Sequence, residues 1–221
     1  MKRFAVILAG VLTAIALFAQ LPPGAKPPGE DWVQIFNGKD LSGWHNVGVE
    51  QWTVEPDHSV RGKAVTKNYG YLETVKYYRD FQLALRFKCV EMGNSGVYYH
   101  TKFKPGTVDV SQGGQFEIDC NINHHTGGVY DAVVGWLVWP APENETVVRP
   151  SEWNEYLLTV DGNRYICRLN GVILVDFTDP NAKFHDGTIA LQLHSGGTAE
   201  MLFRDIWIRD LTRLRVTAAG R

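Results

Sequence analysis

The sequence has few of the features that mark several large protein classes. Its 221 residues include only 3 cysteines, so a dense disulfide scaffold is excluded. The 22 basic residues do not outnumber the 24 acidic ones, which argues against a nucleic-acid partner. Beyond the N-terminal segment no long window has a helical period of 3.6, and the cysteine and histidine spacing of zinc modules is missing. These absences favour a β-rich domain.

Only one long apolar run is present, from Phe4 to Phe18, with Lys2 and Arg3 before it and Ala19 after it. A basic start, a short apolar run and a small residue are typical of a cleavable secretory signal, and the run is short for a membrane span. We therefore expect a signal peptide over residues 1–19 and a periplasmic or secreted mature protein without a stable membrane anchor. An uncleaved N-terminal anchor is the alternative. A Pro/Gly-rich linker is expected over residues 20–31.

The remaining residues alternate between apolar and polar in short stretches separated by turn signals. Residues 80–90 alternate cleanly, and Asp161-Gly162 and Asn170-Gly171 divide residues 156–177 into a three-stranded meander. This pattern predicts an all-β sandwich over residues 32–211, followed by a tail over residues 212–221 that is frayed from Leu214 on. The expected core positions are Phe81, Leu83, Leu85, Phe87, Phe116, Ile118, Leu157, Val160, Leu191 and Leu193.

The cysteines leave two pairings open. Cys89 and Cys120 fall on the apolar phase of their strands, which favours burial, whereas Cys167 is less clear. A Cys89–Cys120 or a Cys120–Cys167 bridge is compatible with the sequence, which does not choose between them.

Polar side chains share one phase on three predicted strands. Glu117 and Asp119 alternate with apolar residues, so both carboxylates face the same side of a strand. If the strands are neighbours, their polar phases form one patch. Carboxylates and amides suit sugar hydroxyls, and aromatic rings suit a pyranose face. The patch would contain Tyr98, His100, Gln115, Glu117, Asp119, Gln192 and His194.

Two further features could belong to such a site. Trp136 and Trp139 stand at the entry to a Pro-flanked loop over residues 140–150 and are candidates for the rim of a cleft. A divalent ion held by His100, Asp119 and His194 is conceivable, and no other metal ligand is assigned.

Several phrases, in order, resemble the bacterial 3-keto-disaccharide hydrolase family, also described as a 3-keto-glucoside 1,2-lyase / 3-keto-2-hydroxyglucal hydratase domain. They are FNGKDLSGW (36–44), WTV (52–54), GNSGV (93–97), WNEY (153–156), NGV (170–172), IALQLH (189–194) and FRDI (203–206). The resemblance covers Trp32 to Leu211 and implies a concanavalin A-like (lectin/glucanase) jelly-roll sandwich in an exported protein. Tyr98 and His100 stand where Gln and Arg are expected after the Asn-Ser-Gly-Val phrase.

The resemblance also implies a chemistry. A ketone at C3 acidifies the C2 hydrogen of a sugar, so a base can eliminate the group on C1, and water then adds to the product. The expected base is Glu117 or Asp119, the expected donor or enolate stabiliser is His194 or His100, and Tyr98, Gln115 and Gln192 would hold hydroxyls.

Two other functions remain as alternatives. A non-catalytic lectin-like module would use the same fold and the same polar face. A laminarinase-type hydrolase would need a third carboxylate after Glu117 and Asp119, at residue 121 or 122. These two residues are Asn121 and Ile122, which carry no carboxylate.

Overall fold

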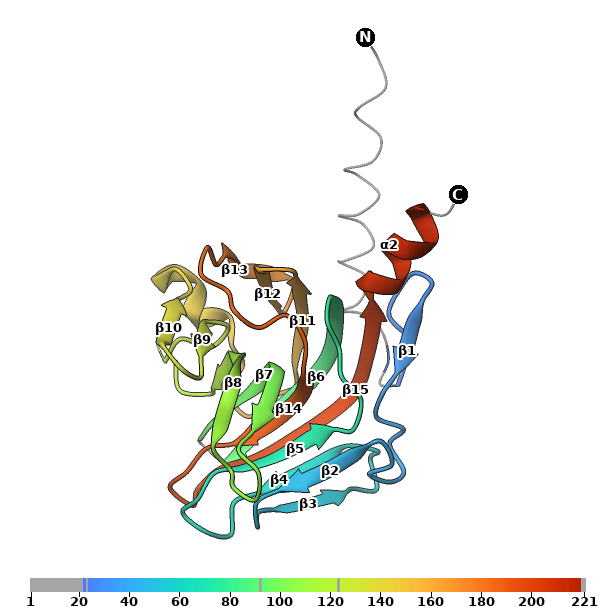
Figure 1. The fold of residues 1–221 in the computed structure, drawn as a ribbon. Coiled ribbons are helices and arrows are strands. Elements are labelled where there is room, and N and C mark those ends of the chain that lie inside the picture. The colour runs from blue at the N-terminus through green and yellow to red at the C-terminus, as the bar shows by residue number, and fades with distance from the viewer. Residues whose placement is uncertain (1–21, 23, 92, 123, 220–221) are drawn as a thin grey trace.

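The computed structural model describes residues 22, 24–91, 93–122 and 124–219, which form two facing antiparallel sheets (Figure 1). The signal peptide expected over residues 1–19 lies outside the described residues. Within them, no helix is long and apolar enough to cross a membrane. The strands are β1 (Trp32–Gln34), β2 (Trp44–Val47), β3 (Gln51–Val54), β4 (Val60–Lys63), β5 (Gly70–Thr74), β6 (Phe81–Glu91), β7 (Asn94–Phe103), β8 (Val110–Asp119), β9 (Val129–Asp131), β10 (Gly135–Val138), β11 (Asn154–Asp161), β12 (Arg164–Leu169), β13 (Val172–Thr178), β14 (Thr188–Leu193) and β15 (Glu200–Asp210).

The two sheets have the layout of a concanavalin A-like jelly roll, as the resemblance implied. Among the described residues, one sheet has eight strands in the order β13-β12-β11-β6-β15-β4-β3, with β1 added beside β15. The other has seven strands in the order β10-β9-β8-β7-β14-β5-β2. The predicted meander forms β11, β12 and β13, because both Gly-containing turns reverse the chain as expected. Neighbours in space come from distant parts of the sequence, and β14 lies between β7 and β5.

The apolar phases of both sheets meet in one core. Its fully buried aromatic residues include Phe87, Phe116 and Tyr156, and the Tyr156 hydroxyl donates a hydrogen bond across the core to the backbone carbonyl of Glu117. The tyrosine therefore ties the eight-stranded sheet to β8 at the residue whose side chain points to the opposite face.

One expectation about the core was wrong. Leu157 does not face the core with Val160, since residues three apart on a strand point to opposite faces. It packs instead against Trp32, Ala84 and Trp207 on the outer side of its sheet. The C-terminal end, which was expected to be frayed from Leu214 on, instead belongs as far as Ala219 to helix α2 (Leu211–Ala219), which continues from the end of β15 (Figure 1).

The structure contains one of the two cysteine pairings that the sequence left open. Cys89 on β6 is bonded to Cys120, which directly follows β8, so the disulfide links the two sheets. Cys167 is free and buried, and this burial raises the pKa of its thiol far above the ordinary value. It has the environment of a packing residue rather than of a nucleophile.

Candidate functional site

The seven-stranded sheet carries the polar patch on the face that points away from the core. Opposite residues of an antiparallel pair point to the same side, so the register decides which side chains meet. Glu117 on β8 lies opposite Gly96 on β7, which in turn lies opposite Gln192 on β14. These three residues form one row across the sheet. The next row on the same face, toward the end of β8, contains Asp119, Asn94 and His194. The row on the other side contains Tyr98, Gln115, Tyr130 and Trp136.

Apart from Asp119, the side chains of these rows line a cleft of about 500 Å³. Its size falls in the range of small-molecule sites, and its lining mixes aromatic rings with a few polar groups. Of the residues proposed from the sequence, the cleft brings together Tyr98, Gln115, Glu117, Trp136, Gln192 and His194. The further lining residues, which the sequence reasoning missed, include the tyrosine and amide side chains of Tyr69, Tyr71, Asn94 and Tyr130.

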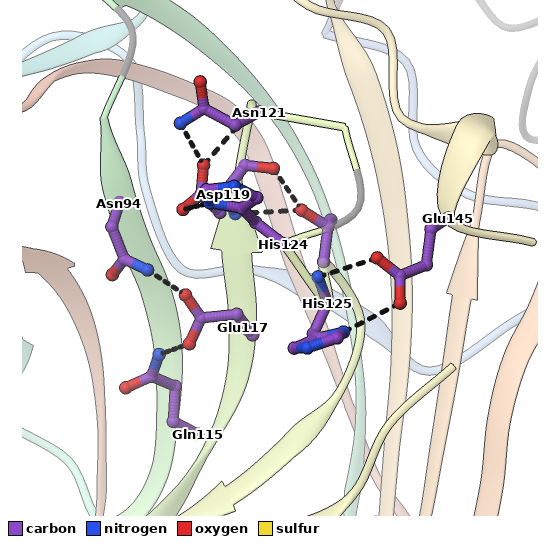
Figure 2. Close-up of polar contacts among 9 residues, drawn as sticks. Asn94, Gln115, Glu117, Asp119, Asn121, His124, His125 and Glu145 are labelled. Atoms are coloured by element: carbon purple, nitrogen blue, oxygen red, sulfur yellow. Dashed lines mark hydrogen bonds and ion pairs between the residues drawn. The ribbon is translucent and has the colours of Figure 1, made fainter. Parts of the chain in front are cut away.

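Glu117 is the carboxylate at the centre of the cleft. It is 4% exposed, and its two oxygens accept hydrogen bonds from the side-chain amides of Asn94 and Gln115 (Figure 2). Burial disfavours the charged form and raises its pKa to about 8, although both amides oppose the shift. The negative charge of Asp119 adds to the rise. A carboxyl group with a pKa near neutrality in a cleft is suited to proton transfer.

The residues 94–96 explain how Glu117 acquires these partners. Asn94 supplies one amide, and Ser95 donates a hydrogen bond to the backbone of Gln192 at 2.6 Å. Gly96 leaves room for the other amide, because a Cβ atom at this position would lie 2.6 Å from the side-chain amide of Gln115. The Asn-Ser-Gly phrase therefore shapes the surroundings of Glu117.

Tyr69, which precedes β5, and His194, which follows β14, line the cleft on the side of Glu117 away from β9 and β10. The Tyr69 hydroxyl lies 3.2 Å from Nε2 of His194, and Nδ1 of His194 lies 3.0 Å from the backbone oxygen of Ser195. A carbonyl accepts only from N–H, so Nδ1 carries the proton and Nε2 accepts from Tyr69. Tyr98 receives a hydrogen bond from the Gln192 amide at 3.2 Å, and burial raises the pKa of its hydroxyl. Tyr98 is therefore a neutral hydrogen-bonding group.

Asp119 shares the face of Glu117 but does not line the cleft. Its Oδ1 accepts from the backbone and side-chain amides of Asn121 at 2.8 and 2.7 Å. Its Oδ2 lies 3.1 Å from Nδ1 of His124 (Figure 2). Because these donors already surround the carboxylate, Asp119 is placed to act on Glu117 through its charge rather than on a bound molecule.

His100 is not part of the patch, contrary to the prediction. The pairing of β7 with β8 shifts after Tyr99, and His100 has a φ of +52°. This bulge reverses the alternation, and the ring bonds to the backbone oxygens of Arg79 at 2.6 Å and Phe184 at 3.1 Å. Apolar and polar residues alternate regularly through residues 97–101, so the sequence did not predict the bulge.

The divalent ion considered from the sequence loses one of its three ligands with His100. Among the described residues, no group of three or more histidine, cysteine, aspartate or glutamate side chains is arranged to hold a metal ion.

Trp136 and Trp139 lie at the β10 end of the cleft, and both are exposed. Trp136 lines the cleft and packs edge to face with Tyr130, at 5.4 Å between ring centroids. Trp139 lies outside the lining residues and stacks in parallel on His125 at 4.4 Å. Of the two tryptophans, only Trp136 therefore lines the cleft itself.

Comparison with solved structures agrees with the fold. A solved structure from Parabacteroides distasonis, given as a candidate glycosyl hydrolase, is 24% identical with a TM-score of 0.63, covering 82% of this chain and 94% of that one. A carbohydrate-binding module from Bacillus subtilis is 14% identical with a TM-score of 0.59, covering 76% and 96%. At these identities the likeness concerns the fold alone.

Sequence comparison is more specific. A 3-keto-disaccharide hydrolase from Bacteroides thetaiotaomicron is 30% identical over 89 residues, which span 36% of this chain and 29% of that relative. The family model described as a 3-keto-alpha-glucoside-1,2-lyase-like domain matches residues 31–209. Since this match covers most of the chain, the protein belongs to the 3-keto-alpha-glucoside-1,2-lyase-like family.

Proposed function

We propose that this protein cleaves 3-keto-glycosides by elimination and hydration, with Glu117 as the general base. The observation that carries the proposal is the buried Glu117, whose pKa is raised to about 8 in a cleft lined by amides and phenols. Family membership and the name of the B. thetaiotaomicron relative support the substrate class.

The proposed reaction begins at C2 of the 3-keto sugar. Glu117 takes the C2 proton, and the electron pair moves into an enolate with its negative charge on the C3 oxygen. The enolate then returns its electrons to form the C1–C2 double bond as the C1–O bond breaks. The departing oxygen takes the proton that Glu117 removed, so the C1 substituent leaves as an alcohol and Glu117 is ionised again. Water adds its oxygen to C1 and a proton to C2, so the net change is hydrolysis.

The other side chains of the cleft have roles in this scheme. The enolate oxygen needs a hydrogen-bond donor, and the Tyr69 hydroxyl supplies one when it turns its single proton from His194 to the sugar. Gln192 and Tyr98 hold sugar hydroxyls through their amide and phenol. Asn94 and Gln115 orient the Glu117 carboxylate toward the bound ring.

The test is to incubate purified protein with 3-keto-trehalose and a 3-keto-β-glucoside and to follow the enone by ultraviolet absorbance. Glu117→Gln should lower turnover by about 10²-fold or more. Because a base must be ionised, wild-type turnover should rise with pH up to about 8, the pKa of Glu117. Asp119→Asn should mainly shift this profile to lower pH, because it removes a charge that raises the pKa of Glu117.

Three results would contradict the assignment. Full turnover by Glu117→Gln would place the base elsewhere. A wild-type rate that falls with rising pH would make Glu117 an acid. Sugar binding without turnover would favour the lectin-like alternative.

We also propose that the protein is exported, with a mature chain that starts near Gln20. The disulfide between Cys89 and Cys120 supports this, since such bonds persist in oxidising compartments. Mass spectrometry of the native protein after cell fractionation should find the new N-terminus outside the cytoplasm. An intact Met1 would contradict cleavage.

A further inference from the structure

We propose that Trp136 and Trp139 form a second subsite, which takes a ring-shaped leaving group such as another pyranose or an aromatic aglycone. This inference rests on the proposed function, because it assigns the place of the group that leaves from C1. It concerns the end of the cleft formed by β9, β10 and the loop that follows them.

The rings of the two tryptophans form a corner. Their ring centroids lie 6.1 Å apart and their planes meet at 78°. Trp136 is 41% exposed and Trp139 is 54% exposed, although large apolar side chains are usually buried. Adjacent exposed rings offer an apolar surface to which the C–H face of a sugar or an aromatic ring can bind.

A third ring packs against both tryptophans. The ring of His125 stacks on Trp139 with an angle of 6° between the planes, and it meets Trp136 edge to face at 5.7 Å between ring centroids. His125 in turn bonds to the buried carboxylate of Glu145, through Nδ1 at 2.7 Å and through its backbone N–H at 3.1 Å (Figure 2). Glu145 belongs to the 3₁₀ helix Pro142–Val147 in the Pro-flanked loop. A braced platform loses less conformational freedom on binding than a free side chain does.

The corner continues the cleft in a direction that fits the chemistry. Across the sheet the order is Trp136 on β10, Tyr130 on β9, Glu117 on β8, and then His194 after β14 with Tyr69 before β5. In a 3-keto-glycoside the order is leaving group, C1, C2 and C3. If C2 lies at Glu117 and the C3 oxygen at Tyr69, the leaving group points toward Trp136.

The spacing indicates the size of that group. β10 is two strands from β8, and neighbouring strands are about 4.8 Å apart, so Trp136 is roughly 10 Å from Glu117 across the sheet. A methyl group on the C1 oxygen does not reach this far, whereas a second ring does. The subsite therefore favours disaccharides and aryl glycosides over small alkyl glycosides.

The kinetic test compares phenyl and methyl 3-keto-β-glucosides. Trp139→Ala should lower the ratio of their kcat/KM values, phenyl over methyl, by about tenfold, and Trp139→Phe should restore most of it. The matched control is Tyr77→Ala, because Tyr77 is also 54% exposed and lies outside the cleft. Circular dichroism checks that each variant is folded. An unchanged ratio in both Trp139→Ala and Trp136→Ala would overturn the proposal.

A binding test separates failure of the subsite from failure of the proposed reaction. Calorimetry with the unoxidised phenyl and methyl β-glucosides needs no turnover. Tighter binding of the phenyl glucoside by the wild type, abolished in Trp139→Ala, would support the subsite even if no 3-keto substrate reacts. Two results together would overturn the subsite while leaving the reaction at Glu117 intact. The wild type would bind the two glucosides equally or not detectably, and the phenyl-over-methyl ratio of kcat/KM would be unchanged in both tryptophan variants.

Discussion

At the scale of single residues, the site depends on a conflict around Glu117. Two amides donate hydrogen bonds to its carboxylate and favour the ionised form, whereas burial and the charge of Asp119 favour the neutral form. Burial is the largest of these effects, so the pKa of Glu117 is about 8 instead of the ordinary value of 4.5. The protein therefore keeps a base that accepts a proton readily, at some cost in stability.

That cost predicts a pH-dependent stability. Because the pKa of Glu117 is higher in the folded than in the unfolded state, the folded protein binds more protons between pH 4.5 and about 8, and its free energy of unfolding falls as pH rises through that window. Glu117→Gln removes this loss, on the order of 3–5 kcal/mol. Thermal melts should show a larger gain for the variant at about pH 9 than at about pH 5.

The control for this measurement is Glu143→Gln, since Glu143 is exposed. Its difference from the wild type should be similar at both pH values. A Glu117→Gln gain that does not grow with pH would show that the buried carboxyl carries no such cost.

A second residue-scale prediction concerns Gly96. In Gly96→Ala the new methyl group would displace the Gln115 amide rather than backbone, so the fold should survive while turnover falls about tenfold through the lost hydrogen bond to Glu117. Kinetics of Gln115→Ala with and without Gly96→Ala would check this. The glycine substitution should add little once Gln115 is gone, and additive losses would contradict the stated role of Gly96.

Strict alternation is the part of the site that could be read from the sequence. It identified Glu117, Gln192 and His194 because β8 and β14 are regular there. It failed at His100, where a bulge reverses the faces, and it missed Tyr69, which precedes its strand. It also missed Asn94, whose role depends on the β7–β8 register and not on its own neighbours in sequence.

At the scale of elements, β14 supports the cleft from the core side. Leu191 is fully buried and lies opposite Leu72 on β5 and Val97 on β7. Its alternation with Gln192 makes the same strand serve the core on one face and the cleft on the other.

Leu191→Ala should therefore lower the free energy of unfolding by roughly 2–5 kcal/mol, through lost transfer energy and a residual cavity. Denaturant titration measures the change. Ile173→Ala on β13 is the control, because Ile173 is 44% exposed and should cost much less. Equal losses for the two variants would contradict the packing.

At the scale of the whole molecule, the sandwich class followed from short alternating strands, and the jelly-roll layout followed from the family resemblance. Alternation alone could not give the strand order, because β14 pairs with β5 and β7 across more than 85 residues of sequence. It also could not choose the disulfide, since this depends on β6 and the end of β8 meeting across the core. The cleft arises from this assembly, as its lining comes from six different strands or their ends.

The central claim is that cleavage proceeds through removal of the C2 proton by Glu117. The most direct measurement compares turnover of a 3-keto-glucoside that carries deuterium at C2 with that of the unlabelled substrate, under single-turnover conditions. The account predicts clearly slower turnover of the deuterated substrate by the wild type, because a C2 bond to hydrogen breaks before the leaving group departs. Equal rates for the two substrates, with the deuterium still at C2 of the released sugar, would contradict it and indicate direct cleavage at C1 without proton abstraction.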